Sequence, residues 1–128
     1  MRKTILMILL AVVSSSAVAE WVKVSSDETI TIYKDPATIR KNGNWAKMWY
    51  LFDFKTVQVD GGNKFRSLKS QSEFDCKEEQ VRLLSFSAHS KIMGGGDVVD
   101  SKSDHFRWDP VPPGSVNEVL WKIACGKR

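Results

Sequence analysis

The C-terminal segment constrains the fold of this chain more than any other. Residues 110–126 read PVPPGSVNEVLWKIACG, which combines a proline-rich start, a helical pattern and a cysteine near the end. Ser115 stands three residues before Glu118, the spacing of a capping box, and Gly126 suits the position just past a helix end. The segment therefore predicts a single C-terminal helix of about three turns.

The apolar residues of this helix follow its period. Val116, Val119, Leu120 and Ile123 recur at positions i, i+3, i+4 and i+7. This spacing places four side chains on one stripe of a helix. We therefore expect the stripe to face a sheet and the helix to pack on it.

The first 19 residues have the pattern of a secretory signal peptide. Arg2 and Lys3 precede an apolar run at 5–13, and the run is followed by small residues at 17–19. A membrane anchor is the alternative, but this run is much shorter than the roughly 20 residues that span a bilayer. We expect cleavage before Glu20, one domain at 20–128, no stable membrane insertion, and an exported product in the periplasm, at the cell surface or outside the cell.

Only two cysteines, Cys76 and Cys125, occur in the chain. Export brings them into an oxidising compartment, which favours a disulfide. The two cysteines are 49 positions apart. Closing a loop of this length stabilises a fold by about 4 kcal/mol in the chain-entropy model. The two histidines, His89 and His105, do not supply the four nitrogen and sulfur ligands of a structural zinc site. We expect no metal.

The net charge gives little support to a nucleic-acid partner. The sequence has 19 basic and 15 acidic residues, a net charge of +4. Without Arg2 and Lys3 there are 17 basic residues against 15 acidic ones, which leaves +2. The remaining cations are dispersed along the chain, and no block of like charges occurs. We therefore expect no nucleic acid among the partners.

Between the two ends, turn residues separate stretches that alternate in polarity. In the longest stretch, alternate positions 46, 48, 50, 52 and 54 are all apolar or aromatic, which predicts a core-facing side. Asp35-Pro36 is expected to end the second stretch, because proline has no backbone N–H. This pattern predicts an α+β fold: an antiparallel meander of about six strands with one helix on one face. The expected strands are 20–25, 29–34, 45–59, 65–76, 81–91, 97–101 and a short 106–108.

Catalytic patterns are weak. His89 lies among serines and His105 follows Asp104, but neighbouring strand residues point to opposite faces. Gly94-Gly95-Gly96 lacks the lysine and the helix start of a phosphate-binding loop, and we expect a flexible hairpin tip. We expect no enzyme activity and no cofactor; a hydrolase that uses one of the histidines is the least favoured alternative.

Tryptophans beside charged residues are the better functional signal. Tryptophan in such surroundings is typical of binding hot spots, although packing under a neighbouring strand or loop is an equally good explanation. A second, basic cluster on the following strand is either a solvated face or a site for a polyanion. Sheet edges offer a further route, through strand addition or homodimer pairing. The candidate binding surface consists of Trp45, Lys47, Trp49, Lys64, Arg66 and Lys69.

Several motifs resemble one known family in combination. They are IYKDPATIR at 32–40, WYLFDF at 49–54, RSLKSQSEFDC at 66–76 with RLL at 82–84, and finally WDPVPPGS at 108–115 with LWKIAC at 120–125. In this order they resemble the surface-adhesin protein E family of Gram-negative bacteria. The resemblance covers nearly all of the chain after residue 20.

The resemblance implies a sheet of about six strands whose concave face holds the C-terminal helix through a Cys76–Cys125 disulfide. It also implies binding to host extracellular-matrix or serum proteins and suggests homodimers. No ligand-binding residue can be matched, and no lipid-accepting cysteine stands near the cleavage site. The alternative is a periplasmic module that binds or inhibits another envelope protein.

Overall fold

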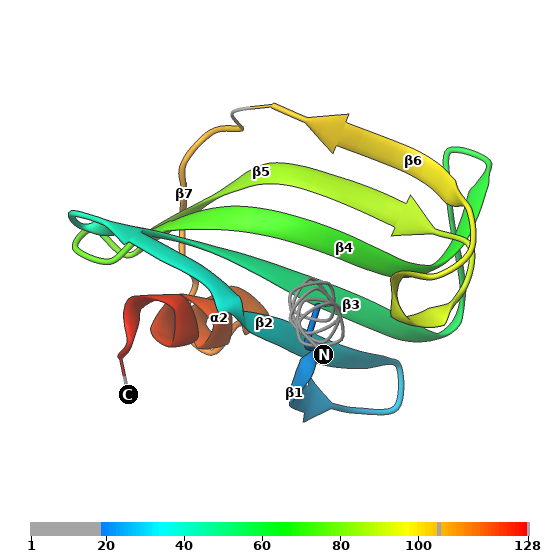
Figure 1. Cartoon of the computed structure of the whole chain (residues 1–128), viewed down its shortest axis with the longest axis horizontal. Helices are drawn as coiled ribbons and strands as arrows, with labels where there is room; N and C mark the ends of the chain where they lie inside the picture. The colour runs from blue at the N-terminus through cyan, green and yellow to red at the C-terminus, as the bar shows by residue number, and fades with distance from the viewer. Residues whose placement is uncertain (1–18, 105, 128) are drawn as a thin grey trace, which may run out of the picture.

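The computed structural model describes residues 19–104 and 106–127, which form one curved sheet with a helix against it (Figure 1). The expected signal peptide at 1–19 lies almost wholly outside the described residues. The elements are β1 (Val22–Ser26), β2 (Ile30–Asn42), β3 (Trp45–Asp60), β4 (Asn63–Asp75), β5 (Gln80–His89), the 3-10 turn η2 (Ile92–Gly94), β6 (Val98–Ser103), β7 (Asp109–Pro110) and α2 (Val116–Cys125).

The strands form a meander. Their order in the sheet is β1-β2-β3-β4-β5-β6, every pair is antiparallel, and the two-residue β7 pairs with the start of β5. The predicted α+β meander with a C-terminal helix is confirmed. No helix among the described residues is long and apolar enough to cross a bilayer.

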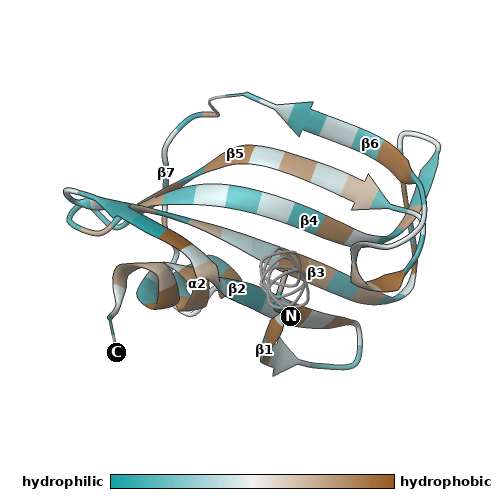
Figure 2. Ribbon diagram, in the orientation of Figure 1, coloured by the Kyte–Doolittle hydropathy of each residue, from teal (hydrophilic) through white to brown (hydrophobic). Residues whose placement is uncertain are grey.

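Alternation along β3 separates the two sides of the sheet, as the sequence predicted. Ala46 and Met48 are fully buried and Tyr50 is nearly so. Ala46 pairs with Phe74 of β4, and both residues belong to the core that α2 covers. We call this side of the sheet the helix face. Figure 2 shows the apolar residues of the strands in brown.

The capping interactions of α2 explain where it begins and ends. The Ser115 hydroxyl accepts a hydrogen bond from the Glu118 amide at 3.2 Å, and the Glu118 carboxylate accepts one from the Gly114 amide at 3.3 Å. At the other end Gly126 adopts a left-handed φ of 68°, which glycine tolerates without strain. Both predicted caps are confirmed, with Gly114 as the second capped amide.

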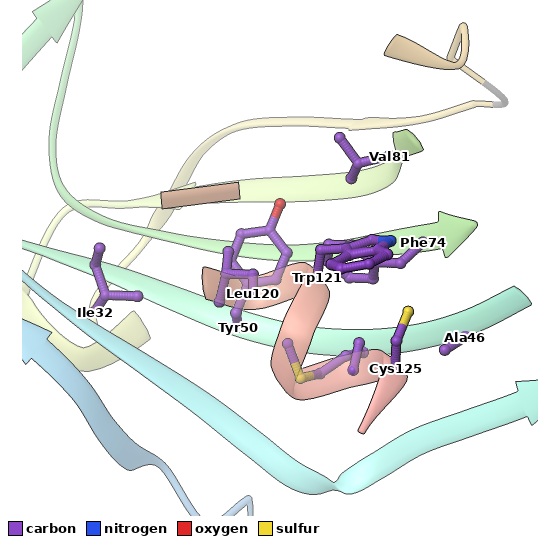
Figure 3. Close-up of a cluster of buried hydrophobic side chains, with 10 residues drawn as sticks. Ile32, Ala46, Tyr50, Phe74, Val81, Leu120, Trp121 and Cys125 are labelled. Atoms are coloured by element: carbon purple, nitrogen blue, oxygen red, sulfur yellow. The ribbon is translucent and has the colours of Figure 1, made fainter. Parts of the chain in front are cut away.

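The predicted apolar stripe of α2 is wrong at two of its four positions. Val116 and Val119 are 43% and 45% exposed. The helix is rotated so that Trp121 enters the core beside Phe74 (Figure 3). Its Nε1 donates a hydrogen bond to the Asp75 carbonyl at 2.8 Å. The buried residues of α2 are Leu120, Trp121, Ala124 and Cys125.

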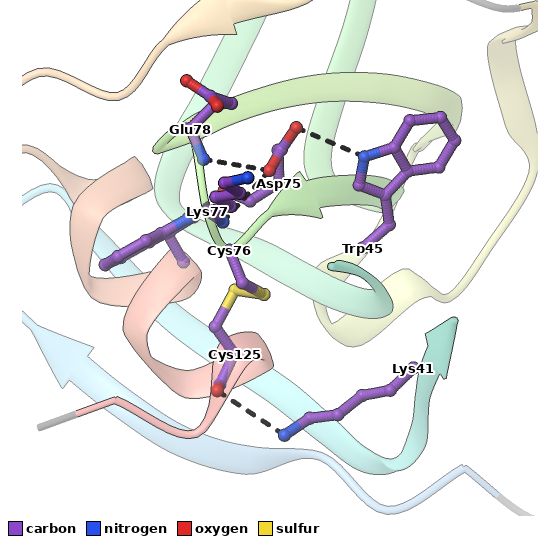
Figure 4. Close-up of a disulfide and its surroundings, with 8 residues drawn as sticks. Lys41, Trp45, Asp75, Cys76, Lys77, Glu78 and Cys125 are labelled. Carbon is purple, nitrogen blue, oxygen red and sulfur yellow. Dashed lines mark hydrogen bonds between the residues drawn. A yellow bond between two sulfur atoms is a disulfide. The ribbon is translucent and has the colours of Figure 1, made fainter. Parts of the chain in front are cut away.

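The disulfide is formed as predicted. Cys76 follows the last residue of β4 and bonds Cys125 in the last turn of α2, with 5.6 Å between the Cα atoms (Figure 4). Lys41 Nζ lies 3.5 Å from the Cys125 carbonyl oxygen, at the carbonyl-rich end of the helix. The end of α2 is therefore held by one covalent bond and one cation.

The expectation that Asp35-Pro36 ends the second strand is wrong. Strand β2 continues to Asn42, and its pairing with β3 shifts register between Asp35 and Arg40. Inside this irregularity the Thr38 hydroxyl donates to the Asp35 carbonyl at 2.6 Å and accepts from the Trp49 amide at 3.0 Å. A side chain thus satisfies the β3 amide where Pro36 interrupts the ladder.

The glycine-rich connection between β5 and β6 folds back onto the sheet and does not form a free hairpin tip. The Met93 amide donates to the Asp53 carboxylate at 3.0 Å, and the Gly94 amide donates to the Ser67 hydroxyl at 2.9 Å. These contacts lie on the side of the sheet opposite α2. They explain why Leu51, which alternation places on that side, is fully buried.

Candidate functional site

The side of the sheet opposite α2 carries the aromatic residues that the sequence singled out. We call it the open face and define it by Trp45, Lys47 and Trp49 of β3 and Lys69 of β4. Trp45 is 40% exposed, Lys47 is exposed and Trp49 is half-buried. The turn η2 covers one end of this face, so Trp45 and Trp49 lie on the part that remains uncovered.

An arginine lies against two tryptophans at the end of the open face away from η2. The Arg82 guanidinium is 5.3 Å from the ring centre of Trp45 and 4.5 Å from that of Trp108. The two ring centres are 5.4 Å apart. Cation–π contact and aromatic packing therefore act together on these three side chains. We call them the arginine–tryptophan cluster.

A carboxylate fixes the arginine from the neighbouring strand. Arg82 is directly opposite Glu73 in the β4–β5 ladder, and its Nε and Nη2 donate to Glu73 Oε1 at 3.0 and 2.6 Å. Glu73 is buried, with 5% of its surface exposed. Because this carboxylate is buried, Arg82 supplies the charge that balances it, and their hydrogen bonds hold the guanidinium in the cluster.

Asp75 holds Trp45, one of the two tryptophans of the cluster, in place. Its Oδ2 accepts a hydrogen bond from Trp45 Nε1 at 3.2 Å, while its Oδ1 accepts from the amides of Lys77 and Glu78, both at 3.0 Å (Figure 4). The carboxylate thus shapes the turn after β4 and orients an exposed indole. The indole of Trp45 is therefore held in one orientation.

A second cation–aromatic pair lies further along the open face. Lys69 Nζ is 5.4 Å from the ring centre of Trp49. Lys47, between the two tryptophans of β3, pairs with Glu73 in the ladder. The structure therefore brings together four of the six residues of the predicted binding surface.

The remaining two predicted residues lie elsewhere. Lys64 is exposed at the far β3–β4 hairpin, opposite Val59. Arg66 donates hydrogen bonds to the carbonyl oxygens of Phe54 and Lys55 at 3.1 and 3.3 Å. These bonds fasten Arg66 to its own hairpin across a register shift in the ladder. The apparent basic cluster in the sequence is thus divided between two parts of the sheet.

Comparison with known proteins identifies the family. The surface-adhesin protein E model matches residues 21–126. The chain belongs to this family. Its structure is similar to crystal form II of Haemophilus influenzae protein E, with a TM-score of 0.61 and 11% identity over 82% of this chain and 96% of that one. A structure of protein E from non-typeable Haemophilus influenzae gives 0.54 and 13% identity over 84% of each chain.

These likenesses concern the fold, because the sequence identities are low. The selenomethionine form of Haemophilus influenzae protein E has a TM-score of 0.62 and 11% identity over 81% of this chain and 85% of that one. No curated protein matches the chain by sequence. The family is one of surface adhesins, so this member is an adhesin-like binding module.

In this adhesin-family chain, the arginine–tryptophan cluster should contribute measurably to stability. Changing Arg82 to methionine keeps most of the apolar stem but leaves the Glu73 carboxylate buried without its partner. We expect the free energy of unfolding to fall by about 2 kcal/mol, measured by urea denaturation. Adding Glu73→Gln should recover part of this loss. A double variant that is less stable than Arg82→Met alone would contradict the assignment.

Among the described residues, His89 has no complete catalytic arrangement around it. His89 Nε2 lies 2.7 Å from the Ser87 hydroxyl, a contact that sequence reasoning missed although positions i and i+2 share a strand face. Burial, and secondarily the charge of Lys69, lowers the pKa of His89. Its Nδ1 is buried without a hydrogen-bond partner among the described residues, so the carboxylate that orients a triad histidine is missing there. His105 lies outside the described residues.

Metal-ligating side chains do not gather in the part of the chain that the structure describes, where no group of three or more histidine, cysteine or acidic residues could hold an ion.

The residues that sequence reasoning missed are Arg82, Glu73 and Trp108. Alternation could have placed Arg82 beside Glu73 once the β4–β5 turn was known. Nothing local indicated Trp108.

Proposed function

We propose that this chain is an exported, non-enzymatic module that binds a protein partner through the open face, and that the partner is a host extracellular-matrix or serum protein. The observation that carries the proposal is a pair of tryptophans, Trp45 and Trp49, on the side of the sheet that α2 leaves uncovered. Membership of an adhesin family supports a role in protein binding.

The physical properties of the open face suit such a role. Tryptophan buries a large area with few rotatable bonds, and central tryptophans dominate many protein interfaces. Trp45 is held by Asp75 and Arg82, so little side-chain entropy is lost when a partner covers it. Lys47 and Lys69 add positive charge on either side of Trp49 and would favour a partner with acidic patches.

Surface plasmon resonance against immobilised matrix and serum proteins tests the proposal. For a partner that binds the wild-type protein, Trp49→Ala should weaken the affinity by about tenfold or more, as expected for a central tryptophan. Lys69→Glu should slow association, whereas Lys64→Glu makes the same charge change on the distant hairpin and should have little effect. Equal losses from both glutamate variants would show a general charge effect instead of a site.

The location of the protein decides which partners it can meet. We propose that residues 1–19 are removed on export and that the remaining domain reaches the cell surface. Protease shaving of intact bacteria measures this directly, because only displayed protein is cut. Full protection, together with cross-links to envelope proteins, would favour the alternative of a periplasmic module that binds or inhibits one of them.

A further inference from the structure

The helix face carries a cavity that α2 does not fill. A helix of 10 residues is about 15 Å long, whereas a strand of 16 residues such as β3 extends over about 50 Å. α2 therefore covers one end of its face, and strands β3 to β6 continue beyond it. The space left has a volume of about 450 Å³, within the range of ligand sites. Its apolar lining includes Tyr50, Phe52, Leu68, Leu83, Phe86 and Ala88.

The rim of this cavity is acidic. Asp60 at the end of β3, Asp100 on β6 and Asp109 on β7 all line it and are exposed. None of the three forms an ion pair with a residue that the structure describes. The chain as a whole has a net charge of +4, so this concentration of negative charge is local. Lys102, the neighbouring cation on β6, lies 5.4 Å from the Phe106 ring and does not line the cavity.

Three carboxylates from separate elements surround an apolar floor. An apolar ligand without charge would leave them unused, and an anionic surface would be repelled. A linear segment with aliphatic or aromatic side chains between lysines or arginines matches both features, since its apolar side chains suit the floor and the carboxylates attract its cations. The Ser70 hydroxyl on the floor and Asn117 in the first turn of α2 add polar groups for its backbone.

We propose that this cavity is a second binding site, which takes a cationic amphipathic peptide segment of a partner protein. The site lies on the opposite side of the sheet from Trp45 and Trp49. It is therefore independent of binding through the open face, and the chain would engage two partners, or two parts of one partner, at once.

Fluorescence anisotropy with a labelled peptide of sequence Lys-Phe-Leu-Lys-Ile-Lys tests the proposal. The wild-type protein should bind it, more weakly as salt is raised, and should not bind the counterpart with glutamate at each lysine position. The triple variant Asp60→Asn/Asp100→Asn/Asp109→Asn should lose about tenfold in affinity, as expected for three exposed charge contacts. The matched control Glu28→Gln/Glu78→Gln/Asp97→Asn makes the same charge change away from the cavity and should bind within twofold of wild type.

Nuclear magnetic resonance locates the bound peptide. Signals of Leu68, Leu83 and Ala88 should shift on addition of the lysine peptide, and those of Trp45 and Trp49 should not. Shifts confined to the open face would overturn the proposal. So would equal binding of the glutamate peptide or of a neutral counterpart with serine for lysine, or no binding at millimolar peptide. These comparisons use the wild-type protein and hold even if a variant fails to fold.

Discussion

Replacing both Cys76 and Cys125 with serine should lower the free energy of unfolding by about 4 kcal/mol. The disulfide joins residues 49 positions apart, so its loss restores much conformational freedom to the unfolded chain. For a domain of this size, 4 kcal/mol is a large part of a total stability of about 5–15 kcal/mol. Urea denaturation followed by tryptophan fluorescence measures the change.

The double variant avoids the unpaired thiol that a single substitution would leave. Wild-type protein in excess reductant is the matched control and should unfold at the same urea concentration as the double variant. A loss below about 1 kcal/mol would mean that the unfolded chain is already constrained near these positions, or that packing of α2 holds the helix without the bond.

Replacing Trp121 with alanine should cost about 4 kcal/mol of unfolding free energy, the usual range for a buried tryptophan. The side chain is 7% exposed, packs in the core and donates a hydrogen bond to the Asp75 carbonyl. Its loss would open a cavity between α2 and the sheet and leave that carbonyl without this donor. Thermal unfolding by circular dichroism and urea titration should agree on the size of the effect.

Val119→Ala is the matched control on the same helix. Val119 is 45% exposed, so its truncation should change stability by less than about 0.5 kcal/mol. The two variants together test the rotation of α2 about its axis. A large loss from Val119→Ala with a small loss from Trp121→Ala would place the apolar stripe of the sequence pattern against the sheet and contradict the observed packing.

The sequence predicted best where local rules decide the outcome. Strand alternation assigned Ala46, Met48 and Tyr50 to the core, because neighbouring side chains in a strand must point to opposite faces. The caps at Ser115 and Gly126 were likewise readable from spacing, since capping depends on a few consecutive residues. The disulfide followed from the presence of only two cysteines and an expected oxidising compartment.

Prediction failed where a tertiary contact overrides a local preference. The stripe of Val116 and Val119 suggested one rotation of α2, but the Cys125 bond and the Trp121 indole impose another. Asp35-Pro36 suggested a strand end, but the Thr38 hydroxyl replaces the missing ladder bond and β2 continues. For α2 the deciding partners, Cys76 and Asp75, are distant in the chain. For β2 the deciding group is the Thr38 side chain, which no sequence pattern marks.

The candidate site was predictable only in part, for the same reason. Trp45, Lys47 and Trp49 share a face because they alternate along one strand. Lys69 joins them through strand register, which depends on the length of the β3–β4 turn. Trp108 reaches Arg82 because the chain just before β7 lies beside the start of β5, and no local pattern specifies that path.

The meander order of the strands has a consequence for how the chain folds. Every strand from β1 to β6 pairs with its immediate neighbour in sequence, so the sheet can grow hairpin by hairpin without closing a long loop. The docking of α2 is the step that must bridge a large sequence separation. Assembly would therefore end with the docking of the helix. Asp75 would have its full set of partners only then, because its carboxylate accepts a hydrogen bond from Trp45 and its backbone carbonyl accepts one from Trp121 of α2.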